Sequence, residues 1–207
     1  MKLQTDELNS QEFDAEEFIR DFFKPMRISE DRKEDRVETT KDIRDSLLFL
    51  FTLIAVMADY METDWETIET QFGNDLNRII ATHGYASPYM NEYVASKISD
   101  FITTTKNNLG DDPYWLSDER ATAEAANEAN DIVGYKEVRK AIDKGYTQKK
   151  WVTQNDIKVR PSHMKMEGKT VPIKDFFVLD KGKMLYPHDF VNCPEETYNC
   201  RCAVVFL

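Results

Sequence analysis

Apolar residues recur three and four positions apart through most of the first 146 residues, which is the spacing of a buried helix face. A first helix is marked by five such residues: Phe13, Phe18, Ile19, Phe22 and Phe23. Pro25 ends this helix, because proline disfavours helical geometry in the residue before it. The charged residues 27–42 then lead into a second apolar stretch.

Residues 47–58, with the sequence LLFLFTLIAVMA, form this apolar stretch, and Arg44, Asp45 and Asp59 close it. A membrane-spanning helix needs about 20 predominantly apolar residues, and runs of about 10–14 usually belong to buried core helices. We therefore expect a helix surrounded by protein, either by its own chain or by copies of itself. No membrane span is predicted.

Short polar residues and glycines delimit three further helices, because the former cap helix starts and the latter end helices. The predicted segments are 64–84, capped by Thr63 or Asp64, 88–110, with Pro88 early in the helix, and 118–144, capped by Ser117 and stopped by Gly145. In the last of them, four residues make a smooth face for close packing: Ala121, Ala125, Ala126 and Ala129. Arg120, Glu124 and Glu128 stand four residues apart and can form ion pairs along one side.

After Thr147 the pattern changes to the alternation of half-exposed strands. Strands are predicted within residues 149–160, on both sides of a turn at Lys181 and Gly182, and at the C-terminus. In the last strand, Cys200, Cys202, Val204 and Phe206 face one side, and Arg201, Ala203 and Val205 face the other.

These elements predict an α+β fold with two parts. Residues 1–112 form a helical N-terminal region. Residues 113–207 form a second module, with the helix at 118–144 followed by a small β-rich part at 147–207. A β-rich unit of this size has a marginal core, so a staple or a partner helps to stabilise it.

Charge separates the same two parts. The whole chain has a formal net charge of −11, which argues against broad electrostatic binding to nucleic acid. From Thr147 onward, however, ten Lys or Arg residues stand against seven Asp or Glu residues. The basic excess of the C-terminal part is small, so any contact with DNA is predicted to be weak, since affinity grows with the number of neutralised phosphates.

The three cysteines all lie near the C-terminus, and an odd number does not make a disulfide framework. We therefore expect a reducing compartment. Four residues offer soft or borderline ligands, enough for a tetrahedral zinc site: His163, Cys193, Cys200 and Cys202. His188 is a spare candidate. Two alternatives remain: the cysteines are small buried apolar residues, or Cys193 pairs with Cys200 or Cys202 in an oxidising medium.

An acid, a guanidinium and an imidazole also lie close together in the sequence, as Asp156, Arg160 and His163. Such a set can transfer protons and stabilise an anion, which is the minimum for cleaving a phosphodiester. No second histidine or nucleophile joins them at a recognisable spacing. The alternative is that Arg160 and His163 hold a turn together through backbone hydrogen bonds.

Four sequence pieces, taken in order, resemble the phage Mu F-like minor head proteins, also called phage head morphogenesis proteins. They are the S-x-x-R-A and A-x-x-E-A-N helix at 117–130, the W-x-T-x-x-D-x-x-V-R-x-x-H segment at 151–163, the P-x-D at 187–189 and the E-E-x-x-N-C-R-C at 195–202. The resemblance covers residues 114–207.

The resemblance implies a non-enzymatic structural protein of a tailed phage or prophage, made in the host cytoplasm and placed in the interior of the head. Proteins of this kind act in procapsid assembly, DNA packaging or DNA ejection. The implied partners are portal or capsid proteins, other copies of the chain and, weakly, packaged DNA. Some relatives carry a toxin domain, so the alternative is a prophage-encoded effector, a nuclease or transferase, using His163, Arg160 and Asp156.

Overall fold

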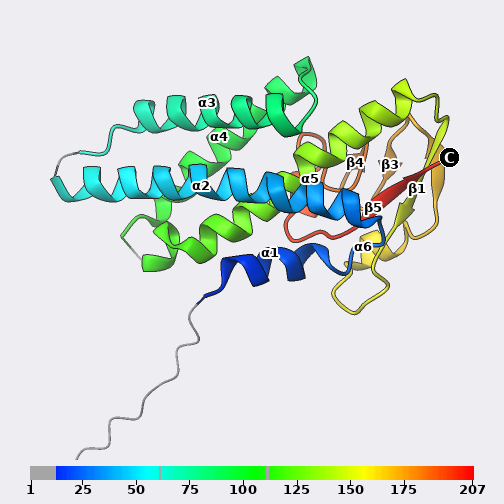
Figure 1. The fold of residues 1–207 in the computed structure, drawn as a ribbon, viewed down its shortest axis with the longest axis horizontal. Helices are drawn as coiled ribbons and strands as arrows, with labels where there is room; N and C mark the ends of the chain where they lie inside the picture. The colour runs from blue at the N-terminus through cyan, green and yellow to red at the C-terminus, as the bar shows by residue number, and fades with distance from the viewer. Residues whose placement is uncertain (1–12, 61, 111) are drawn as a thin grey trace, which may run out of the picture.

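The computed structural model describes residues 13–60, 62–110 and 112–207 and has an α+β fold, as predicted. The helical part comprises α1 (Ala15–Phe23), α2 (Glu30–Tyr60), α3 (Trp65–His83), α4 (Pro88–Asn108), the 3-10 helix η1 (Pro113–Leu116) and α5 (Asp118–Asp143). The helices form an elongated bundle with the strands gathered at one end (Figure 1). No helix among the described residues is long and apolar enough to cross a membrane.

The predicted caps start the helices where the sequence places them. The side chains of the predicted caps Asp64 and Ser117 each accept a hydrogen bond from the backbone N–H three residues further on. Ser87, which precedes α4, makes the same contact with the N–H of Met90. These contacts satisfy N–H groups that have no partner within the helix. Gly84 follows α3, and its N–H donates to the carbonyl of Ile80.

Helix α2 begins much earlier than the apolar run. The charged residues that were expected only to lead into it are helical from Glu30 onward. They lack an apolar period because, apart from Val37, the buried positions here are polar: Arg36, Thr39 and Thr40. The Thr40 hydroxyl donates a hydrogen bond to the carbonyl of Arg36, and the Arg36 side chain donates to Asn130 on α5.

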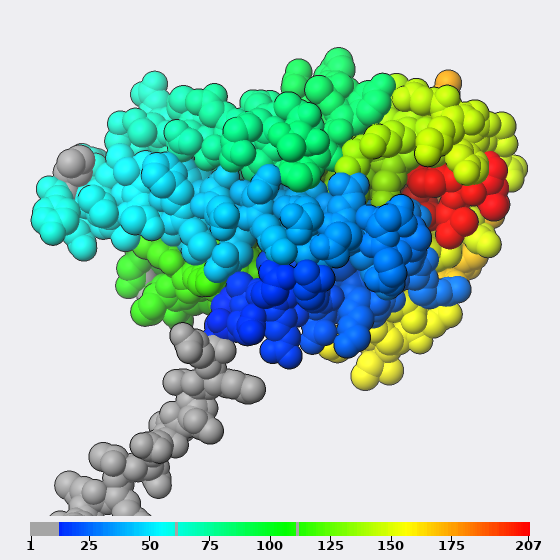
Figure 2. All heavy atoms as spheres, viewed as in Figure 1, coloured from blue at the N-terminus to red at the C-terminus, as the bar shows by residue number. Residues whose placement is uncertain are grey.

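The second half of α2 is the predicted core helix. Leu47, Leu50 and Ile54 are buried on its inner side. Its outer side keeps Phe49 56% and Val56 49% exposed, so the run is amphipathic rather than enclosed on all sides. On the face shown in Figure 2, α2 runs along the middle, with α3 above it and α1 below it, and the C-terminal residues lie beside the start of α2.

Helix α5 runs through the centre of the fold. The four alanines of the predicted packing face are all buried, and so are most other positions, which include Asn130, Asp131 and Lys136. Polar residues at these positions have partners from other elements, so the helix shows little apolar periodicity in the sequence.

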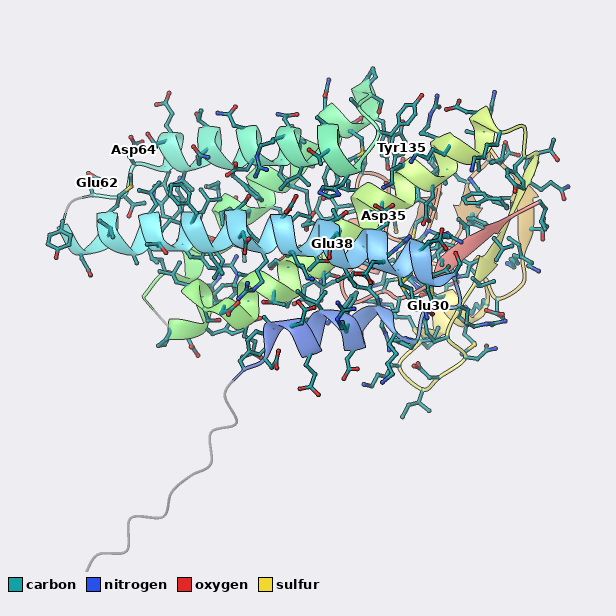
Figure 3. The ribbon with its side chains drawn as sticks, in the orientation of Figure 1. Glu30, Asp35, Glu38, Glu62, Asp64 and Tyr135 are labelled. Carbon is teal, nitrogen blue, oxygen red and sulfur yellow. The ribbon has the colours of Figure 1, made fainter. Side chains whose placement is uncertain are left out.

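Acidic side chains lie along α2 at Glu30, Asp35 and Glu38, and Glu62 and Asp64 precede α3 (Figure 3).

The C-terminal part contains two small antiparallel sheets. Strands β2 (Thr170–Pro172), β1 (Gln148–Val152) and β5 (Ala203–Phe206) form the first, with β1 in the centre and Trp151 opposite Val204. Strands β3 (Phe177–Val178) and β4 (Lys183–Met184) form the predicted hairpin. The short helix α6 (Pro161–Met164) and the 3-10 helix η2 (Pro194–Glu196) lie in the connections. Strand β1 is shorter than predicted: it ends at Val152, and Ile157 is fully exposed.

Two clusters of buried apolar residues make the core. The larger joins α2, α3, α4 and α5 and also takes in Ala203 of β5. The smaller gathers Trp151, Phe177, Cys202 and Val204 under the sheets. The alternation predicted for the last strand is thus seen as Ala203 facing one cluster and Val204 the other. The division of the chain at residue 112 stays a prediction, and the larger core spans it.

Candidate metal centre

The segment before β5 is bent so that two sulfurs face inward. Asn199 has a positive φ of 56°, which asparagine tolerates better than most residues. Its N–H donates to the side-chain oxygen of Asn127 on α5. Cys200 and Cys202 follow, and both are buried, with 3% and 4% of their surface exposed. Arg201, between them, turns the other way and pairs with Asp156 at 3.3 Å, as the alternation predicted.

His163 lies on α6 and meets this segment from the other side. Its imidazole is 1% exposed and packs edge-on against the Trp151 ring, with the ring centres 5.3 Å apart. Its Nδ1 atom lies 3.4 Å from Cys200 Sγ and 3.6 Å from Cys202 Sγ. The fold thereby brings His163 into one cluster with Cys200 and Cys202, which lie 37 and 39 positions after it in the sequence.

The cluster shifts the acidity of both thiols. Burial alone raises the pKa of the Cys200 thiol, but hydrogen bonds with Cys202 and His163 outweigh burial, and the pKa is lowered. The hydrogen bond with Cys200 and burial raise the pKa of Cys202. Cys200 is therefore the thiol that ionises first, and the thiolate is the form of cysteine that binds metals.

Three of the four predicted ligands meet. Within the described part of the chain, His163, Cys200 and Cys202 offer ligand atoms that all lie within 4.8 Å of one another. Cys193 does not belong to this group: it packs against the β3–β4 hairpin, where a Cβ added at Gly182 is 2.9 Å from its sulfur. The spare candidate His188 places its Nε2 against the backbone carbonyl of Cys200 instead. All three cysteines are free thiols.

The three residues of the proposed acid–base set have separate contacts. Asp156 pairs with Arg201, and Arg160 donates to the backbone carbonyl of Tyr198. His163 faces the sulfurs with Nδ1. The backbone contact of Arg160 joins residues 38 positions apart, so it connects two segments rather than holding one turn together.

Glu196 also lies in this cluster, although no pattern in the sequence singles it out. It is 2% exposed, accepts a hydrogen bond of 2.9 Å from the Ser162 hydroxyl, and places Oε2 3.3 Å from Nε2 of His163. The sequence does not indicate that Glu196 is buried, because the neighbouring Glu195 is the same type of residue and is exposed.

A sequence model of the family described as Phage Mu protein F like protein matches residues 95–205, more than half of the chain. The chain belongs to this family. The Mu F-like match begins within α4, earlier than the resemblance at 114–207, and includes α5, both sheets and the whole His163 cluster. Comparisons with curated proteins and with solved structures gave no match.

Proposed function

We propose that this Mu F-like chain is a minor head protein, present in a few copies per particle beside the portal in the head interior. There it acts without catalysis in procapsid assembly, DNA packaging or DNA ejection. The observation that carries the proposal is the family match over residues 95–205. Membership makes the chain a phage head morphogenesis protein, and the position beside the portal is the proposed refinement.

An exposed apolar stripe on α2 supports a role in protein contacts. Phe49, Leu53, Val56 and Tyr60 follow one another at intervals of four, three and four residues, so they share one helix face. Phe49, Val56 and Tyr60 are 56%, 49% and 82% exposed, and Leu53 is partly buried. A stripe of this kind fits against a helix of another subunit, either a portal or capsid protein or a second copy of this chain.

The surroundings of Asp156, Arg160 and His163 support a structural rather than a catalytic role for these residues. General acid–base catalysis needs groups that converge on one reacting atom. Here His163 is buried, and Asp156 and Arg160 are engaged by Arg201 and by the Tyr198 carbonyl. The slight basic excess after Thr147 is compatible with a weak approach to packaged DNA.

The test is quantitative mass spectrometry of purified particles, counting this chain against the portal protein. We expect a fixed, small number of copies per portal. Absence from particles, with the chain accumulating in the host, overturns the proposal and favours the effector alternative.

A pair of double variants tests the contact surface in the same particles. Phe49→Ser with Val56→Ser removes the α2 stripe, and we expect the copy number to fall at least several-fold. Ile157→Ser with Val178→Ser is the matched control, because these apolar side chains are also exposed but lie in the C-terminal part. Equal incorporation of both variants rules out the stripe as the contact surface.

A further inference from the structure

The distances within the His163 cluster match the edges of a zinc coordination shell. Zinc binds thiolate sulfur at about 2.3 Å and imidazole nitrogen at about 2.0–2.1 Å, and tetrahedral angles then separate N from S by about 3.5 Å. Nδ1 of His163 lies 3.4 Å from one sulfur and 3.6 Å from the other. One imidazole nitrogen has either one proton to donate or one lone pair to accept a thiol proton, so it cannot make a full hydrogen bond to both sulfurs. One metal ion, in contrast, binds all three atoms.

The far side of the imidazole supplies a second, independent observation. Nε2 of His163 is buried and makes no hydrogen bond to any residue that the structure describes, although Oε2 of Glu196 lies 3.3 Å away. When a metal holds Nδ1, the ring proton must sit on Nε2, the nitrogen that lies 3.3 Å from Oε2 of Glu196. Metal-bound histidines almost always have such a carboxylate or carbonyl partner, which fixes the ring orientation. The Ser162 hydroxyl in turn holds Glu196 in place.

A small, partly open cavity beside the three ligand atoms leaves room for a fourth ligand. A cavity of about 10 Å³ adjoins His163, Cys200 and Cys202 and is also lined by Gln154, Lys158 and Asn199, among others. This is close to the volume of about 10–15 Å³ that one water molecule requires. The side-chain Nε2 of Gln154 is buried and has no hydrogen-bond partner among the described residues, so it is placed to contact a water there.

We infer that this chain binds one Zn²⁺ through His163 Nδ1, Cys200 Sγ and Cys202 Sγ, with a water as the fourth ligand and Glu196 orienting His163. The ion takes two thiolates and a neutral imidazole, the soft and borderline ligands that favour zinc over magnesium or calcium. It ties α6 to the segment that leads into β5. The inference is independent of the proposed function, and it excludes Cys193 from the set that the sequence predicted.

The test uses the untagged full-length protein, purified in a reducing buffer with zinc present. Elemental analysis by mass spectrometry is expected to give one zinc per chain. Replacement by Co²⁺ is expected to give the intense near-ultraviolet absorption of thiolate-to-cobalt charge transfer. A folded wild-type protein that binds neither zinc nor cobalt at micromolar concentration overturns the inference.

Variants separate the ligands from the nearby cysteine. Cys202→Ser is expected to lose the cobalt–thiolate band, or to bind cobalt with an affinity at least ten-fold lower than that of the wild type. Cys193→Ser, another buried free cysteine, is the matched control and is expected to keep one zinc per chain. Zinc lost equally from both variants, with circular dichroism showing both folded, contradicts the three-residue assignment.

Glu196→Gln provides a readout that does not depend on removing a ligand. An amide still accepts through its oxygen but carries no charge, and loss of such a supporting group typically costs about 10–100-fold in metal affinity. We expect a weaker zinc affinity by competition with a chelating dye, with the cobalt spectrum retained. An unchanged affinity removes Glu196 from the site and leaves the three ligands to be judged by the cysteine variants.

Discussion

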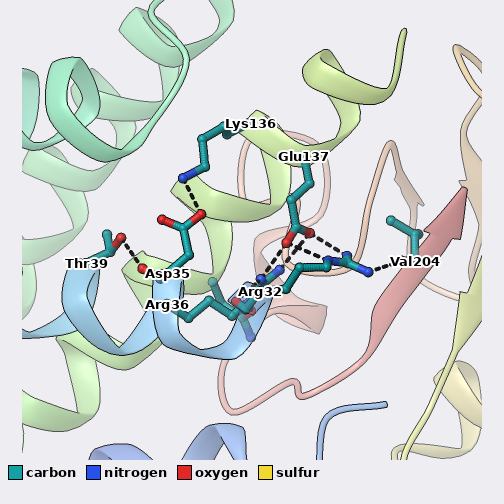
Figure 4. Close-up of polar contacts among 8 residues, drawn as sticks. Arg32, Asp35, Arg36, Thr39, Lys136, Glu137 and Val204 are labelled. Carbon is teal, nitrogen blue, oxygen red and sulfur yellow. Dashed lines mark hydrogen bonds and ion pairs between the residues drawn. The ribbon is translucent and has the colours of Figure 1, made fainter. Parts of the chain in front are cut away.

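Arg36 on α2 and Glu137 on α5 are 101 positions apart in the sequence and form a buried ion pair. The guanidinium donates to both carboxylate oxygens, at 2.7 and 2.9 Å. Arg32 makes a second paired contact with the same carboxylate and also donates to the backbone carbonyl of Val204 in β5 (Figure 4). One carboxylate on α5 thus connects the start of α2 to the C-terminal strand.

Removing this carboxylate is expected to destabilise the fold strongly. Glu137→Gln leaves Arg36 buried without its counter-charge, and breaking a buried pair in this way costs about 3–5 kcal/mol in the free energy of unfolding. Urea denaturation at pH 7 measures the loss. Glu34→Gln is the matched control, because Glu34 on α2 is a half-exposed partner of Arg20 on α1, and we expect little change there.

The effect of Glu137→Gln should depend on pH. Burial raises the pKa of Glu137, but Arg36 and Arg32 outweigh it and lower the pKa from 4.5 to about 2. Because the folded state holds this proton more weakly than the unfolded state, the contribution is complete above pH 4.5 and is lost as the pH falls toward 2. The gap between the two proteins should therefore close in that window. A gap that is constant down to pH 2 contradicts the assignment.

Asp131 on α5 should behave in the opposite sense. Burial raises its pKa well above 3.8, and the nearby carboxylate of Asp189 adds to this, although hydrogen bonds from Tyr186 and the Phe190 N–H oppose it. The folded state therefore binds the proton more tightly than the unfolded state does. The resulting stability is complete below pH 3.8 and is lost as the pH rises through the folded pKa.

Asp131→Asn should raise the free energy of unfolding at pH 7 by about 1 kcal/mol, because a neutral amide avoids burying the charge. Its oxygen can accept from the Phe190 N–H, and its NH₂ group can donate to Tyr186 Oη. The advantage over the wild type should shrink toward pH 4 in denaturation curves. A stability gain that does not vary with pH contradicts this explanation.

Asp189→Asn is the contrasting variant. One oxygen of Asp189 accepts from the Leu185 N–H and the other from the Asn192 N–H, so an amide there places a donor against a donor. We expect a loss of about 1–3 kcal/mol at pH 7, the cost of a buried group left without a partner. Equal behaviour of the two Asp→Asn variants shows that hydrogen-bond direction does not decide their signs.

Two helix glycines provide a matched test of packing. A Cβ added at Gly134 lies 2.9 Å from the Tyr186 ring, whose hydroxyl is fixed by Asp131. At Gly73 the nearest atom is the flexible tip of Ile98, at 3.0 Å. Ala gains about 1 kcal/mol over Gly in a helix interior. Overpacking of a rigid site costs about 1–3 kcal/mol.

Gly134→Ala is therefore expected to lower the thermal unfolding midpoint, whereas Gly73→Ala should leave it unchanged or raise it. Differential scanning calorimetry of the two variants beside the wild type makes the comparison. If Gly134→Ala is as stable as Gly73→Ala, the Tyr186 ring has room to move and the close approach at α5 is not a constraint.

The order of the elements, their caps and the α+β class followed from the sequence by itself. Asp64, Ser87 and Ser117 start helices through contacts with backbone N–H groups three positions away, so their effect is local. The hairpin at Gly182 and the alternation around Ala203 and Val204 depend likewise on neighbours along the chain. Local rules such as these can be applied without knowing what packs against each element.

Tertiary structure alone decided the polar interior and the composition of the candidate metal site. Arg36 looks like a surface residue until Glu137 is brought beside it, so the first turns of α2 were not recognised as helix. Cys193 and Cys202 have the same chemistry, and only the folded chain sends one to the hairpin and the other to His163. The Ser162 hydroxyl on α6, 34 positions away in the sequence, donates a hydrogen bond to Glu196 and holds it in place. Charged and ligating side chains are buried only with partners that compensate them, and those partners come from distant parts of the chain.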